Sequence, residues 1–200
     1  MSFMKIRYCI VVVILPLISI TPAFSQEDST VVRQEFSKMF DEVDKGNYAY
    51  LFDKIYPKFY EIIPRELLEK AMMDALHSED VELKLYDSKI DDVIFLENLD
   101  GIAYYKVEYS NKMSMKYLNL QEDKDSSFDM NALLLAALGK EFGADNVSFN
   151  ETENKYEVKA VKSSLAILDP EYEGWKVINI EKAYRPVLIK ILPETILNHF

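Results

Sequence analysis

The spacing of the apolar residues changes after His77, and this change constrains the fold more than any other feature of the sequence. Before His77, apolar side chains recur every three to four positions, as one face of a helix requires. Three helices are therefore predicted, over residues 28–45, 47–57 and 64–77. After His77, Val81, Leu83 and Leu85 alternate with polar residues, which is the period of a half-buried strand. A second strand is predicted from 90 to 96.

Residues 102–120 predict a long strand because their apolar side chains keep a period of two. These are Ala103, Tyr105, Val107, Tyr109, Met113, Met115 and Tyr117. A two-residue hairpin at Ser110 and Asn111 would turn Ser114 and Lys116 toward the core, which that period makes costly. We expect one long bent strand, with a three-residue hairpin over 110–112 as the alternative. The Asp100-Gly101 pair before it predicts a tight turn.

The rest of the chain adds one helix, the remaining strands and short C-terminal helices. Asp129 is placed to cap a helix near 129–141. In the strand over 155–167 the apolar positions change from even to odd, which predicts a β-bulge. A last strand begins at Trp175. The pattern predicts an α+β fold, with N-terminal helices packed on a strongly curved antiparallel sheet.

The first 25 residues have the pattern of a secretory signal peptide. Lys5 and Arg7 precede an apolar run from Cys9 to Ile20, and small residues around Ala23 follow. We expect cleavage after Ser25, a single mature domain over 26–200, and export to the periplasm or the outside. An uncleaved anchor is the alternative, but the run is shorter than the ~20 residues that a bilayer span needs. No stable membrane insertion is therefore expected after cleavage.

The composition of the mature chain excludes several classes of function. It has 21 basic and 34 acidic residues, a net charge of −13 that repels nucleic acid. It has no cysteine, so disulfides, thiol nucleophiles and cysteine metal sites are excluded. Asp74 and His77 share a helix face, but the only other histidine is His199, and a metal is not expected. No cofactor motif is present, and no cofactor is predicted.

Three sequence stretches resemble a known superfamily. GNYAYLFDKIYPKFYEIIPRELL, the strands after it and the final EGWKVINIE are similar to uncharacterised exported Bacteroidetes proteins of the NTF2-like superfamily. The resemblance covers most of 27–200 and implies an α+β cone whose curved sheet wraps a long helix, with 129–141 as an inserted helix. The superfamily contains isomerase-like and dehydratase-like enzymes as well as binding domains, so the resemblance does not select an activity.

Polar residues at apolar positions of the predicted sheet indicate where a site would lie. Asp92, Asn111 and Asn179 occupy such positions. A cone would bring all three together with aromatic and methionine side chains around one pocket. The predicted ligand-binding residues are Tyr105, Tyr109, Asn111, Met113, Met115, Tyr117, Trp175 and Asn179.

Two functions are consistent with such a pocket. The first is a non-catalytic domain that binds a small apolar molecule or another envelope protein, with a possible homodimer through the sheet. The alternative is an isomerase- or dehydratase-like enzyme for an apolar carbonyl-bearing substrate, with Asp92 as general base. Each polar residue also has a structural explanation. Adjacent acids such as Asp91 and Asp92 often mark a bulge or the end of a strand. Asn111 lies at the expected bend of its strand, and Asn179 lies at the expected open end of the sheet. Trp175 is expected to pack in the core, with pocket lining as the alternative.

Overall fold

The structure is a computed structural model that describes residues 26–119 and 129–200. It is an α+β protein with an open five-stranded antiparallel sheet. The predicted signal peptide lies outside the described residues. Among the residues described, no helix is long and apolar enough to cross a membrane.

The N-terminal helices form where the apolar period predicts them, with one difference. The helices are α1 (Gln26–Asp44), α2 (Tyr48–Lys54), α3 (Pro57–Tyr60) and α4 (Arg65–Leu76). The second predicted helix is interrupted at Ile55 and Tyr56, whose backbones are extended. Pro57 explains the break, because proline disfavours helical backbone in the residue before it and suits the first turn of a new helix.

The first two strands of the sheet are long and pair with each other. They are β1 (Val81–Leu99) and β2 (Ile102–Tyr117), joined by a turn in which Asp100 and Gly101 both have positive φ (52° and 87°). The single long strand at 102–117 is therefore confirmed, and the hairpin over 110–112 is absent. Residues 81–96 form one strand instead of the predicted two, because β1 continues through three shifts of register against β2.

The shorter strands pair around the third long strand, β4 (Lys155–Leu168). Along its outer edge, β3 (Val147–Asn150) pairs with the first residues of β4, and β5 (Lys176–Asn179) pairs with the last. The bulge predicted in β4 is wrong, since β4 pairs with β2 without a shift from Leu168 to Tyr156. The change of apolar phase has another cause: β4 buries one face over 156–160 and both faces over 164–167.

Two cores lie on opposite faces of the sheet. On the first face, α1 places Val32 and Phe36 against β2, β4 and β5. On the second face, α6 (Arg185–Ile191) and α7 (Glu194–Leu197) cover Leu165 and Ile167. A short 3-10 helix, Lys182–Tyr184, leads into α6, and another, Ala144–Asn146, precedes β3.

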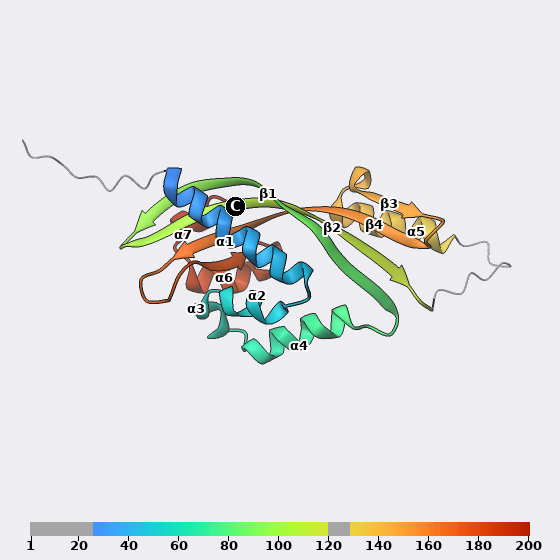
Figure 1. Ribbon diagram of the computed structural model, residues 1–200, viewed down its shortest axis with the longest axis horizontal. Helices are drawn as coiled ribbons and strands as arrows, with labels where there is room; N and C mark the ends of the chain where they lie inside the picture. The colour runs from blue at the N-terminus through green and yellow to red at the C-terminus, as the bar shows by residue number, and fades with distance from the viewer. Residues whose placement is uncertain (1–25, 120–128) are drawn as a thin grey trace, which may run out of the picture.

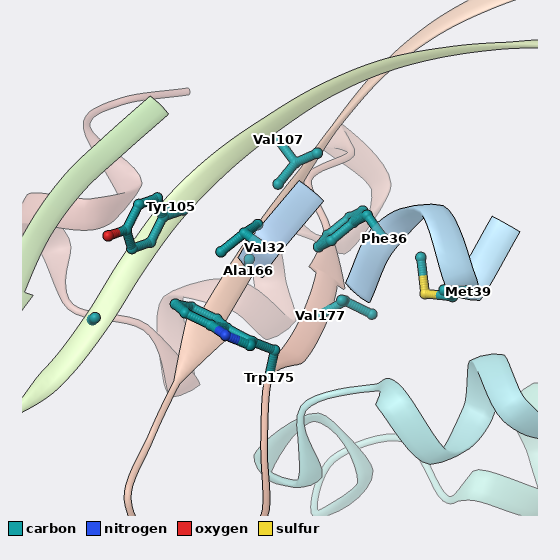
Figure 2. Packing of buried hydrophobic residues seen from close by; sticks show 9 residues of the cluster. Val32, Phe36, Met39, Tyr105, Val107, Ala166, Trp175 and Val177 are labelled. Carbon is teal, nitrogen blue, oxygen red and sulfur yellow. The ribbon is translucent and has the colours of Figure 1, made fainter. Parts of the chain in front are cut away.

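Trp175 belongs to the first core, as expected. Its side chain is 7% exposed and its ring meets the Tyr105 ring edge to face, with centroids 5.4 Å apart. Figure 2 shows the indole beneath Val32 and Ala166, directed into the cluster. The alternative, in which Trp175 lines a pocket, stays a prediction.

The molecule is elongated, with helices at both ends of the long strands (Figure 1). One end carries α1, α2, α3, α6 and α7, and the opposite end carries β3 and α5 (Met130–Phe142). The Asp129 side chain caps α5 by accepting a hydrogen bond from the Ala132 backbone N–H at 2.9 Å, as the sequence predicts. Tyr156 of β4 donates a hydrogen bond to Asn131 of α5 at 2.6 Å, which holds this helix on the sheet.

Candidate functional site

A pocket of about 350 Å³ lies between α2, α3, α4 and the edge strand β5. Its lining is aliphatic or aromatic except for one amide. The lining residues are Leu51, Phe52, Ile55, Phe59, Leu68, Ala71, Met72, Val177, Ile178, Asn179 and Tyr184. Pockets of about 300–1,000 Å³ with mostly apolar walls and a few polar groups are typical of small-molecule sites.

The wall formed by α2 and β5 is fixed by backbone contacts. Ile55 forms a parallel bridge with Val177, and the Tyr56 backbone N–H donates to the Val177 carbonyl at 3.0 Å. The break before Pro57 makes this possible, because it frees the Tyr56 N–H from a helix. The same break therefore ends α2 and attaches the pocket wall to the sheet.

The opposite wall is α4, which flanks the pocket and contributes no residue to either core. Leu68, Ala71 and Met72 face the pocket at helical spacing, and none of the residues of α4 is fully buried. The start of α4 is anchored by Arg65, whose guanidinium contacts the Asp53 carboxylate at 2.7 Å. This wall is thus tied to α2 at one end and packed loosely along the rest of its length.

A buried carboxylate fixes the loop that leads into β5. Asp169 is 3% exposed, and it accepts hydrogen bonds from the Tyr56 hydroxyl at 2.7 Å and from the Glu171 backbone N–H at 3.0 Å. Burial acts against ionisation, but these hydrogen bonds and the nearby Lys58 ammonium outweigh it and lower the pKa of Asp169. The ionised carboxylate joins the α2–α3 junction to the loop before Trp175.

The polar group of the pocket is the side chain of Asn179, which is exposed at the pocket rim. Its Oδ1 accepts hydrogen bonds from Ser164 Oγ at 2.6 Å and, more weakly, from the Tyr109 hydroxyl at 3.4 Å. Burial raises the pKa of Tyr109, so its hydroxyl keeps the proton that it donates. Both hydroxyl groups hold the amide in one orientation.

The residues predicted to bind a ligand lie along the sheet and do not gather around this pocket. Tyr105 and Trp175 pack in the first core, and Tyr109 meets Asn179. Asn111, Met113, Met115 and Tyr117 continue toward the α5 end of β2, opposite Ala160, Val158 and Tyr156 of β4. At about 3.3 Å per residue, Tyr105 and Tyr117 are separated by about 40 Å of strand. An open sheet cannot bring them to one pocket.

Among the predicted residues, Asn179 alone lines the described pocket. The rest of the lining was missed, and the one available indication in the sequence was the helical spacing of Leu68, Ala71 and Met72. Ligand binding by the other predicted residues stays a prediction. Asn111 has a buried Oδ1 with no hydrogen-bond partner among the described residues.

Asp92, the predicted general base of the alternative function, lies on the surface of β1. It is exposed, and its Oδ1 accepts a hydrogen bond from the backbone N–H of Val93 at 2.8 Å. A register shift of β1 falls between Ile90 and Asp92, which agrees with the structural explanation of the two adjacent acids. Asp92 thus faces water and lies outside the lining of the pocket, and its role as general base stays a prediction.

Within 26–119 and 129–200, no three histidine, cysteine, aspartate or glutamate side chains are grouped as a metal site would need. His77 is exposed at the C-terminal end of α4, where its Nδ1 lies 3.0 Å from the Met73 carbonyl. This placement is that of a residue that caps the end of a helix.

The fold and the pocket together define an α+β protein with an open antiparallel sheet and a mostly apolar pocket at one edge. The chain matches no family model, no curated protein and no solved structure.

Proposed function

We propose that this protein is an exported, non-catalytic domain that binds a small apolar molecule in the pocket between α2, α4 and β5. The observation that carries the proposal is the lining, in which apolar side chains from four elements surround one oriented amide. Such walls favour binding because they bury apolar surface of the ligand, which contributes about 25 cal/mol of binding free energy per Å².

The chemistry of the lining supports binding more than catalysis. The residues that line the pocket include no carboxylate, no imidazole and no lysine. The tyrosine hydroxyl of Tyr184 is the only titratable group among them. A proton-transfer enzyme needs a base within hydrogen-bond reach of its substrate, and Asp92 does not provide one here.

The proposal includes export and an NTF2-like relationship. Export rests on the leader pattern of residues 1–25. The long helix α1 packed across one face of the sheet, with further helices before the first strand, supports the relationship.

A partner protein remains part of the proposal, as another envelope protein or a second copy. For a homodimer, one face of the sheet at the α5 end carries even-numbered residues of β2 and odd-numbered residues of β4, among them Lys112, Lys116 and Lys159. Such a charged face does not favour pairing through that part of the sheet.

A pocket-filling substitution tests the proposal. Replacing Ala71 with Trp would occupy the pocket from α4, and Ala75→Trp puts the same side chain on the same helix at an exposed position outside the lining. We expect the wild-type protein and A75W to bind radiolabelled decane in equilibrium dialysis, and A71W to lose at least ~10-fold in affinity. Failure of the wild-type protein to bind decane, or equal binding by A71W, contradicts the proposal.

A further inference from the structure

The geometry points to the chemical class of the ligand: an uncharged molecule of about a dozen non-hydrogen atoms, with an apolar body and one acceptor oxygen that meets the side-chain NH₂ of Asn179. This inference rests on the proposed function. It adds the size, the charge and the hydrogen-bonding group of the molecule, none of which follows from an apolar pocket alone.

The orientation of the Asn179 amide determines which kind of polar group it recognises. The hydroxyl groups of Ser164 and Tyr109 both donate hydrogen bonds to Oδ1 of Asn179. The amide oxygen is therefore occupied by donors, and the Nδ2 hydrogens have no partner among the described residues. A ligand at the rim of the pocket meets a donor, so it must present an acceptor oxygen.

The support behind this amide is well buried. Ser164 is 2% exposed and Tyr109 is 8% exposed, whereas Asn179 itself is exposed at the end of β5. Ser164 pairs directly with Asn179 across β4 and β5, which fixes the separation of their side chains. The arrangement is a rigid polar support that presents an accessible donor.

The volume of the pocket limits the size of the molecule. A cavity of about 150 Å³ holds benzene. The pocket of about 350 Å³ is slightly more than twice as large, so it accommodates about a dozen non-hydrogen atoms. The exposed position of Asn179 places the acceptor oxygen at the rim and the apolar body between α2 and α4.

The charges around Asn179 favour an uncharged ligand. The lining contains no arginine or lysine to pair with a carboxylate. Lys162 lies near the end of β5, and its ammonium is already bound by the Glu181 carboxylate at 3.0 Å. Glu181 follows Asn179 by two residues, and its ion pair with Lys162 leaves no net positive charge there to hold an anion at the rim.

Esters and ketones with a medium-length hydrocarbon chain meet all these conditions. Methyl decanoate, decanoate and decane form a matched series, because they share a ten-carbon chain and differ in the acceptor oxygen and in charge. Equilibrium dialysis of each radiolabelled compound against the mature protein measures the three affinities. We expect methyl decanoate to bind about 10-fold more tightly than decane, as one net hydrogen bond allows, and decanoate to bind more weakly than methyl decanoate.

Substitution of Asn179 separates the inference from the proposed function. In Asn179→Leu we expect methyl decanoate to lose its roughly 10-fold preference while decane stays within about twofold of wild type. Asn198→Leu, which changes an exposed amide near the C-terminus, should keep the wild-type order. Far-ultraviolet circular dichroism confirms that each variant is folded.

The outcomes are distinguishable. Equal binding of decane and methyl decanoate to the wild-type protein, or tightest binding of decanoate, overturns the inference and leaves the proposed function standing. A preference that survives in N179L also overturns it, because another group must then recognise the oxygen. Absence of decane binding to the wild-type protein overturns the proposed function itself.

Discussion

The two ends of the sheet are built from the same strands, yet they are stabilised differently. At the helical end, which comprises α1, α2, α3, α6, α7 and the strand residues that they cover, β4 buries consecutive residues from Ser164 to Ile167. At the α5 end, which comprises α5, β3 and the strand residues beside them, β4 buries Tyr156, Val158 and Ala160 on one face only. None of the α5 residues is fully buried.

This difference in burial indicates which end of the sheet contributes more to stability and where the pocket lies. Burial on both faces roughly doubles the number of side chains that a given length of strand removes from water, and each buried apolar side chain adds to stability. The helical end therefore supplies most of the stabilisation, and the pocket lies against it, between β5 and α4. The α5 end projects from this rigid region along β2 and β4 (Figure 1).

The largest effect is expected from shortening a side chain in the second core. Leu165→Ala removes a fully buried side chain and should lower the free energy of unfolding by about 2–5 kcal/mol. Val161→Ala, on the same strand at 64% exposure, should change it by less than about 0.5 kcal/mol. Urea denaturation of both variants gives the comparison, and similar values would show that burial on both faces does not dominate.

A smaller effect is expected from the tyrosine–carboxylate pairs, one of which lies at each end. Tyr56→Phe removes a hydrogen bond to the buried Asp169 carboxylate and should cost about 1.5–3 kcal/mol. Tyr86→Phe removes the corresponding bond to the partly exposed Glu157 at the α5 end, and should cost less than about 1 kcal/mol. Chemical denaturation measures both, and an equal loss would contradict a difference between the ends.

The smallest effect is a dependence of stability on acid pH through Asp169. Because its pKa in the folded protein lies below the ordinary value of 3.8, its ionised form contributes stability above that value. This contribution is lost as the pH falls through the folded pKa. We expect Asp169→Asn to weaken the fall in unfolding free energy between about pH 5 and pH 2.

Glu157→Gln provides the comparison at the α5 end for this pH dependence. The pKa of Glu157 is also lowered, by Lys155 and Tyr86 against the effect of burial, but its carboxylate is more accessible to water than that of Asp169. E157Q should therefore weaken the fall in unfolding free energy at acid pH less than D169N does. If E157Q had the larger effect on the acid dependence of stability, the prediction that Asp169 dominates it would be wrong.

The sequence by itself determined the local elements, because each depends on residues close in the chain. The change of period at His77 separates helices from strands, the Asp100-Gly101 pair makes the turn between β1 and β2, and Asp129 caps α5. Trp175 was also placed in the core from its size and position alone. The bulge predicted in β4 is absent, because a change in burial along β4 produces the same apolar pattern as a shift of register.

Only the tertiary structure decided where the pocket lies and which polar residue serves it. Alternation shows which side chains share a face of a strand, but it does not show whether the sheet closes around them. The sheet is open, so the residues from Tyr105 to Tyr117 extend in a row, and Asp92 faces water. The pocket instead joins Leu51, Ala71 and Asn179, which are far apart in sequence and come together only when α4 and β5 pack on either side of α2.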